Sequence, residues 1–117
     1  MTKYKKEIGA WGEGIAVDWL AEHGTQTIAR NVRTAYGEID IIARQGDMTL
    51  FIEVKTLTSS EYFFPETNIT PRKQQHMLNS AQQYAAEHEI DHWQIDAISV
   101  EGKPGSKPII TYFENVI

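Results

Sequence analysis

The sequence predicts a mixed α/β fold whose elements follow the order α-β-β-β-α-β-β. Amphipathic helical patterns occur at residues 7–23 and again from Thr70 to about residue 89, and they bracket a group of strand-like segments. Inside that group, two runs of β-branched and aromatic residues flank Gln45-Gly46-Asp47, which is typical of a tight hairpin. Two more strand-like segments follow the second helix. A central sheet covered by helices accounts for this arrangement.

The first helix is expected over residues 7–23, because apolar residues recur at helical spacing and Gly24 provides a C-terminal stop. At 100° steps, Glu13 falls at the edge of the apolar stripe. Glycines at positions 9, 12 and 14 each destabilise a helix by up to about 1 kcal/mol relative to Ala. They indicate close backbone packing or the approach of a ligand, or else a helix that starts later, near Glu13.

Three strands are expected between the helices: Thr25–Val32, Glu38–Ala43 and Met48–Thr56. A turn through Tyr36-Gly37 joins the first strand to the second. If Gly46-Asp47 is a two-residue turn, the hairpin register places Asp40 opposite Glu53. The same register places Glu38 opposite Lys55.

This register gives the hairpin two different faces. One face is polar and carries Glu38, Asp40, Glu53 and Lys55. The other is aliphatic and carries Ile39, Ile41, Ile52 and Val54. Carboxylates a few ångströms apart repel one another, so one of them takes up a proton or they share a cation, and hard oxygen ligands favour Mg²⁺ or Mn²⁺ over Zn²⁺. The alternative is an ordinary hairpin whose polar face lies in water, where Glu and Lys pair across the strands for a few tenths of a kcal/mol.

The second helix is expected to begin with Thr70 as its N-cap and Pro71 at its first position. Lys73 and Gln74 continue the apolar stripe of this helix, where polar groups either reach the sheet or extend into solvent. Before the helix, a loop carries adjacent aromatic residues at positions 62–64, which either stack on bases or fold back onto the core. After it, the segments HWQIDAISV and KPIITYFENVI predict two final strands.

Composition limits the class of protein. With 41% hydrophobic and 23% charged residues, we expect a single globular domain over residues 1–117. The absence of Cys excludes disulfides, thiolate zinc sites and Cys nucleophiles. No apolar run is long enough for a membrane span or a signal-peptide core, so we expect a cytoplasmic protein with no membrane partner. The four histidines lack the spacing of a metal motif and are expected at the surface or at the edge of the core.

The net charge of −5 disfavours tight, nonspecific binding to polyanions. An uneven distribution of charge still allows a basic patch, and nucleases need acidic metal ligands. Local basic clusters occur at Lys3, Lys5 and Lys6, at Arg30 and Arg33, and at Arg72 and Lys73.

Several motifs together carry a family resemblance. GEGIA with Glu13, then RNVR, GEIDIIA, FIEVKT and TPRKQ follow in this order, and over roughly residues 7–100 the chain resembles the UPF0102 (YraN) family. That family is placed in the restriction-endonuclease-like superfamily and is similar to archaeal Holliday junction resolvases. The resemblance implies a restriction-endonuclease-like core: a helix, a three-strand meander, a second helix and further strands. It also implies a Mg²⁺-dependent or Mn²⁺-dependent endonuclease-like protein that hydrolyses DNA phosphodiester bonds, with branched DNA as a candidate substrate.

The resemblance assigns roles to particular residues. Asp40 and Glu53 correspond to the acidic pair that holds the metal, Lys55 to the lysine beside it, and Glu13 to the acidic residue on the first helix. Weaker candidates, for contact with the substrate, are Glu38, Arg30, Arg33, Arg72, Lys73 and Gln74. In this chemistry the metal acidifies a water and neutralises charge on the phosphate. Lys55 then positions that water or stabilises the pentacoordinate phosphorus.

Two residues depart from the family pattern. Leu57 and Phe64 stand where many members carry a basic residue and a glycine, at positions where substrate contacts are expected. Three classes of function therefore remain: a DNA phosphodiesterase, a catalytically inactive module that binds nucleic acid, and a scaffold that binds a protein partner. A homodimer is a further candidate assembly, because resolvase-like relatives cut two strands symmetrically.

Overall fold

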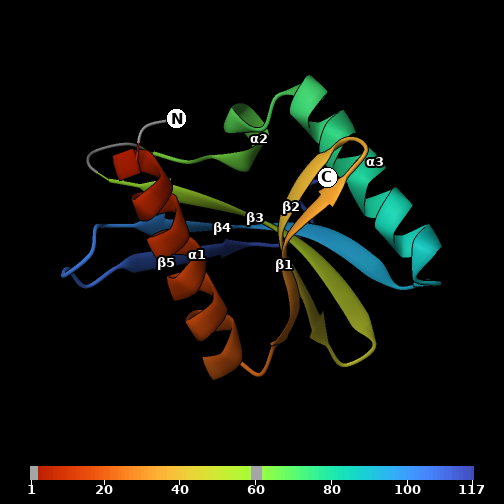
Figure 1. Cartoon of the computed structure of the whole chain (residues 1–117), viewed down its shortest axis with the longest axis horizontal. Coiled ribbons are helices and arrows are strands. Elements are labelled where there is room, and N and C mark those ends of the chain that lie inside the picture. The colour runs from red at the N-terminus through yellow and green to blue at the C-terminus, as the bar shows by residue number, and fades with distance from the viewer. Residues whose placement is uncertain (1–2, 59–61) are drawn as a thin grey trace.

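A five-stranded mixed sheet with helices on both faces forms the centre of the molecule (Figure 1). The computed structural model describes residues 3–58 and 62–117. Within these residues the elements are α1 (Lys3–Glu22), β1 (Gln26–Thr34), β2 (Gly37–Gln45), β3 (Met48–Leu57), α2 (Pro65–Asn68), α3 (Pro71–Glu87), β4 (Trp93–Glu101) and β5 (Ile109–Phe113). The predicted mixed α/β class and element order are confirmed, with the short helix α2 added in the loop before α3.

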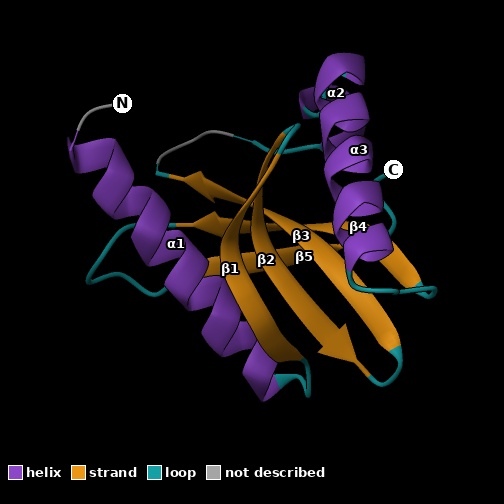
Figure 2. Ribbon diagram, turned by 45° about the vertical axis from the view of Figure 1, so that its right-hand side comes forward, coloured by secondary structure: helices purple, strands orange, loops and turns teal. Residues whose placement is uncertain are grey.

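The strands are arranged in the order β1-β2-β3-β4-β5. Neighbours are antiparallel except β3 and β4, which run parallel from Thr49 to Leu57 of β3. Parallel neighbours need a crossover connection, and α3 provides it. Figure 2 shows the result, with α1 and α3 on opposite faces of the sheet.

Helices α1 and α3 each cover an apolar cluster on one face of the sheet. On one face, residues from α1 pack on β2, β3 and β4: Ala16, Leu20, Ile41, Ala43, Leu50, Ile52, Ile98 and Val100. On the other face, residues from α3 pack on β2, β3 and β4: Ala81, Ala85, Ile39, Ile42, Phe51 and Ile95. The middle strands are therefore buried on both faces, which explains why they read as nearly continuous hydrophobic runs.

The predicted hairpin register is confirmed from Gln45–Met48 to Ile41–Ile52. The ladder ends there, so Asp40 and Glu53 are not a backbone pair. The predicted aliphatic face is correct for Ile41 and Ile52 but wrong for Ile39, which packs on the α3 side. In β1, Asn31 has φ of 51° between the residues paired with Ile41 and Ile39, and the β1–β2 register shifts between Thr27 and Ala29, so the backbone of this strand pair is irregular.

Helix α1 begins at Lys3, so the alternative of a helix starting near Glu13 is wrong. Close packing is the reason for one of its glycines. A Cβ atom at Gly12 would lie 2.1 Å from Thr56 Oγ1, whereas nothing lies within 4 Å of the corresponding position at Gly14. Gly12 therefore lets the backbone of α1 approach β3 directly beside Glu13.

Helix α3 begins as predicted. The Thr70 hydroxyl accepts a hydrogen bond from the backbone amide of Lys73 at 3.2 Å, and Pro71 occupies the first helical position. The helix ends at Glu87, and no helix within the described residues is long and apolar enough to cross a membrane.

The loop before α3 divides its aromatic residues between core and solvent. Phe63 is buried against Phe113 with ring centroids 5.7 Å apart, while Tyr62 and Phe64 are exposed and stack on each other. Leu57 is also buried in this cluster, so its expected place at a substrate contact is wrong. Its side chain fills the core under the loop. Residues 59–61 of the predicted loop lie outside the described residues.

Candidate functional site

The sheet opens where β2 and β3 separate, and two carboxylates lie at this opening. Asp40 Oδ2 accepts a hydrogen bond of 2.8 Å from the backbone amide of Val54. This bond spans the two strands just beyond their last paired residues, Ile41 and Ile52. It holds the carboxylate of Asp40 beside the part of β3 that carries Glu53.

Cavities flank the opening on both sides of the sheet. The cavity toward α1 has a volume of about 460 Å³, and its lining includes Gly9, Glu13, Asp40, Glu53 and Lys55. The cavity toward α3 has a volume of about 190 Å³, and its lining includes Tyr36, Asp40, Glu53, Lys73 and His76. Asp40 and Glu53 belong to both linings, so the pair lies between the two cavities.

Asp40 holds its proton unusually tightly. Burial, the largest cause, and the nearby charges of Glu53, Glu13 and Glu38 together raise the pKa of Asp40 from 3.8 to about 8. The hydrogen bond from Val54 acts in the opposite direction but does not overcome burial. Asp40 is therefore mostly protonated at neutral pH unless a cation replaces the proton.

Glu13 reaches the same opening from α1. Burial raises the pKa of Glu13, while a hydrogen bond from the Asn31 side chain and the charge of Arg30 lower it. The distance from Arg30 Nη2 to Glu13 Oε1 is 3.8 Å. Sequence reasoning missed Asn31, although Asn is one of the few residues other than glycine that commonly adopt positive φ. Asn31 has a positive φ, and the hydrogen bond from its side chain to Glu13 makes β1 part of the site.

Three ion pairs among the described residues join predicted acids to predicted cations. Lys73 Nζ lies 2.7 Å from Glu53 Oε1. The other two pairs are Arg30 with Glu13 and Arg33 with Glu38, and the second of these is more open to solvent, with nitrogen and oxygen 3.9 Å apart. Three of the four basic residues predicted to contact a substrate, Arg30, Arg33 and Lys73, therefore each lie against a predicted acid.

The remaining predicted residues divide into two groups. Lys55 is exposed on β3 and lines the α1-side cavity beside Glu53. Arg72 and Gln74 line neither of the two cavities at Asp40. Gln74 instead donates a side-chain hydrogen bond to the carbonyl of Ile69, which ties the preceding loop to α3. His76, expected at the surface or core edge, lines the α3-side cavity one helical turn after Lys73.

The donor set fits a hard divalent cation in its chemistry. Asp40 and Glu53 supply carboxylate oxygens at one opening, Glu13 lies across the α1-side cavity, and mutual repulsion of these acids is what a cation relieves. In the described part of the chain, no three His, Asp or Glu side chains are grouped closely enough to hold a metal ion together. One or two carboxylates with water ligands are a usual set for Mg²⁺, and here Glu53 already pairs with Lys73 at 2.7 Å.

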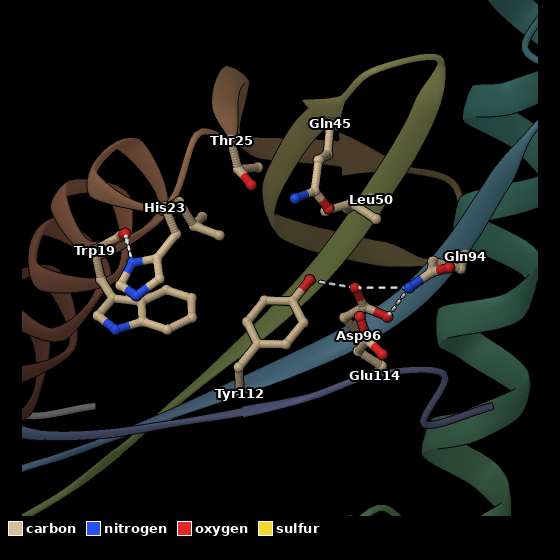
Figure 3. A pocket seen from close by; sticks show the side chains of 10 residues that line it. Trp19, His23, Thr25, Gln45, Leu50, Gln94, Asp96, Tyr112 and Glu114 are labelled. Atoms are coloured by element: carbon tan, nitrogen blue, oxygen red, sulfur yellow. Dashed lines mark hydrogen bonds between the residues drawn. The ribbon is translucent and has the colours of Figure 1, made fainter.

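Another buried acid has a structural role. Asp96 lines a cavity of about 250 Å³ near the C-terminal end of α1 (Figure 3). Its oxygens accept hydrogen bonds from the Gln94 side chain, the Asn115 backbone amide and the Tyr112 hydroxyl. Burial and the hydrogen bond to Asp96 raise the pKa of Tyr112. Asp96 is fully buried and engaged with these donors, so it joins β4 to β5 and the segment after it.

Fold and site define a mixed α/β protein that gathers carboxylates and cations at an opening in its central sheet. The model of the family described as "Uncharacterised protein family UPF0102" matches residues 12–100, and the chain belongs to this family. The resemblance inferred from the motifs is thereby confirmed.

Similar proteins come from distant bacteria. A UPF0102 protein of Syntrophotalea carbinolica is 36% identical over 97% of this chain and 93% of its own length. One from Treponema pallidum is 40% identical over 89% of this chain and 85% of its own length. Among solved structures, Pyrococcus furiosus SfsA in complex with Ca²⁺ is 17% identical with a TM-score of 0.40. That match covers 91% of this chain, which spans 61% of the SfsA chain.

Proposed function

We propose that this protein is a divalent-metal-dependent endonuclease that hydrolyses phosphodiester bonds in DNA. The observation that carries the proposal is the placement of Asp40 and Glu53 together at the opening between β2 and β3, where both line cavities on either side of the sheet. Two acids placed this close together destabilise a fold when both are charged, and such clusters are concentrated at functional sites. Mg²⁺ or Mn²⁺, bound by Asp40, Glu53 and Glu13, is the cofactor that these oxygen ligands favour.

Each residue of the site has a part in the proposed reaction. When bound, the metal ion supplies an acidified water and neutralises charge on the phosphate. The amide of Val54 keeps the Asp40 carboxylate oriented toward the opening. Lys55 extends from β3 into the α1-side cavity, where its ammonium group donates hydrogen bonds to the attacking water or to a phosphate oxygen.

The fold supports the proposal at a coarser level. The order of helix, three-strand meander, helix and further strands agrees with the restriction-endonuclease-like core that the family resemblance implies. The three strands of the meander carry Asn31, Asp40, Glu53 and Lys55, and the flanking helices contribute Glu13 and Lys73. DNA is the proposed partner, and branched DNA is one substrate to be tested.

The test combines metal binding with cleavage. Mn²⁺ is titrated into the wild-type protein, Asp40→Asn and Glu53→Gln, and the same proteins are incubated with linear, three-way and four-way DNA in Mg²⁺ or Mn²⁺ at low salt. We expect wild type to bind Mn²⁺ and cut DNA, and both variants to lose both properties while staying folded. Asp18→Asn, on the exposed face of α1, is the matched control. Intact DNA of every shape with the wild-type protein would contradict the proposal.

A second candidate function is binding of nucleic acid without catalysis. Two observations favour this function. No three side chains among the described residues form a group that could hold a metal ion, and the carboxylate of Glu53 is paired with the ammonium group of Lys73. This function predicts salt-sensitive DNA binding that survives Asp40→Asn. Absence of binding at low salt would exclude it.

A further inference from the structure

We propose that Lys73 is a substrate-positioning residue that exchanges partners. In the metal-free protein it neutralises Glu53, and when a divalent cation binds there it moves to a phosphate group of the nucleic acid. This inference rests on the proposed function and adds a coupling between cofactor and substrate at the same site.

The ion pair has the geometry that such an exchange requires. Lys73 Nζ lies 2.7 Å from Glu53 Oε1, and the two side chains are 49% and 19% exposed. The carboxylate is thus largely enclosed, whereas the ammonium group and its stem are half in solvent and can turn away. The backbone of Lys73 stays fixed, because its amide donates a hydrogen bond to the Thr70 N-cap.

A divalent cation at Glu53 would weaken this ion pair. Positive charges a few ångströms apart repel one another, and the repulsion is stronger in a partly buried site than in water. Asp40 and Glu53 also neutralise a bound dication without help from Lys73. The lysine side chain is flexible and carries three donors on its ammonium group, so it can reorient without any movement of α3.

A phosphate is the partner that the released lysine would meet. Lys73 lines the α3-side cavity together with His76 and Tyr36, and this cavity shares Asp40 and Glu53 with the cavity toward α1. Lys73 also lies in the first turn of the 17-residue helix α3, where the helix dipole favours an anion. A nucleic-acid strand bound at the carboxylate pair would therefore have a phosphate within the reach of Lys73.

Linkage makes the coupling measurable in both directions. If metal binding releases Lys73 for the substrate, the metal raises the affinity for DNA, and DNA raises the affinity for the metal by the same factor. The decisive variant is Lys73→Met, which keeps an unbranched side chain and removes the charge. Arg72→Met is the matched control, because Arg72 is exposed on the same helical turn and lines neither cavity at Asp40.

The first arm is calorimetric titration of Mn²⁺ into the full-length proteins without DNA. Because Lys73 competes with the metal for Glu53, we expect Lys73→Met to bind Mn²⁺ about three- to fivefold more tightly than wild type, the size expected of a half-exposed ion pair. Arg72→Met should remain within about twofold of wild type, since it removes a solvent-exposed charge that lies outside both cavities and is screened by salt. Lys73→Arg should restore the wild-type affinity, because it restores the charge beside Glu53.

The second arm is fluorescence anisotropy with labelled DNA, with and without Ca²⁺, a hard cation that also prefers oxygen ligands. Gel analysis checks that the DNA stays intact. We expect Lys73→Met to weaken DNA binding about threefold or more in Ca²⁺ and to leave it unchanged without metal. Arg72→Met should alter DNA affinity by the same factor in both conditions.

Two results would overturn the inference alone. One is a Lys73→Met variant that binds Mn²⁺ no more tightly than wild type, while Asp40→Asn abolishes binding. The other is a loss of DNA affinity in Lys73→Met that is equal with and without Ca²⁺. If wild type and Asp40→Asn show no difference in Mn²⁺ binding, the metal site itself is refuted, and the proposed function falls together with this inference.

Discussion

The carboxylate of Asp40 accepts a hydrogen bond from the backbone amide of Val54, 2.8 Å away across the point where β2 and β3 part. The bond replaces the strand pairing that the hairpin register would otherwise have continued. It keeps a largely buried acid close to Glu53, whose charge contributes to the raised pKa of Asp40. The chemistry of the site therefore depends on a contact between a side chain and the backbone of the neighbouring strand.

Asp40→Asn should remove a pH dependence from the stability of the metal-free protein. The pKa of Asp40 is raised from 3.8 to about 8, so between these values the folded protein keeps a proton that the unfolded chain releases. Stability therefore falls as pH rises across this window, by at most about 1.4 kcal/mol per pH unit from this group. Urea denaturation at pH 5, 6, 7 and 8 measures the slope. The variant should show a flatter profile and higher stability at pH 8, since its amide oxygen still accepts from Val54.

Asp18→Asn provides the comparison for this experiment, because it makes the same chemical change on the exposed face of α1. Its stability should follow the wild-type pH profile. An Asp40→Asn profile as steep as that of wild type would show that Asp40 is not held protonated in the folded protein.

Alanine at two glycines of α1 should have opposite effects on stability. Gly12→Ala places a methyl group 2.1 Å from Thr56 Oγ1, and rotation of the Thr56 side chain would still leave its Cβ atom at 3.1 Å. We expect a loss of about 1–3 kcal/mol. Gly14→Ala meets nothing within 4 Å and should stabilise by up to about 1 kcal/mol through helix propensity.

Chemical denaturation of both variants provides the measurement. Gly12→Ala should also weaken Mn²⁺ binding, because the helix must move away from β3 and carry Glu13 with it. Equal stabilities for the two variants would contradict the close approach of α1 to β3.

Tyr112→Phe should destabilise the fold without affecting the carboxylate site. The Tyr112 hydroxyl donates to the fully buried carboxylate of Asp96, and its loss leaves that carboxylate with fewer donors. The expected cost is about 1–3 kcal/mol, measured by thermal or chemical unfolding. Tyr62→Phe, in which the exposed ring loses the same hydroxyl, should be nearly neutral. Unchanged Mn²⁺ affinity in Tyr112→Phe would agree with a purely structural Asp96.

Lys55→Ala should strongly reduce the rate of cleavage with little change in fold or metal affinity. Lys55 is exposed, so its removal leaves the core intact, and it lines the cavity that also holds Glu13, Asp40 and Glu53. Loss of one donor to a developing oxyanion reduces rates by roughly 100- to 1,000-fold. Single-turnover DNA cleavage measures the effect, with Lys103→Ala in the exposed β4–β5 connection as the control. Cleavage at the wild-type rate would remove Lys55 from the mechanism.

Local chemistry explains which features could be predicted from the sequence. The Thr70-Pro71 helix start and the Gln45–Met48 turn depend on a few adjacent residues, and both were correctly predicted. The end of the β2–β3 ladder could not be predicted, because beyond Ile41 and Ile52 the amide of Val54 bonds to the Asp40 side chain, and hairpin spacing does not reveal such a contact. The ion pair of Lys73 with Glu53 was also missed, since it joins a helix and a strand whose relative placement sequence spacing does not reveal.

The parallel pairing of β3 with β4 has a consequence for the timing of site formation. Residues of the candidate site lie between Glu13 and Lys73, whereas β4, which pairs with β3 from Thr49 to Leu57, begins at Trp93. During synthesis, all the acids and cations of the site leave the ribosome before the strand that supports them. We expect the site to remain unformed on the nascent chain, so that metal binding and any cleavage begin only after β4 has emerged and inserted beside β3.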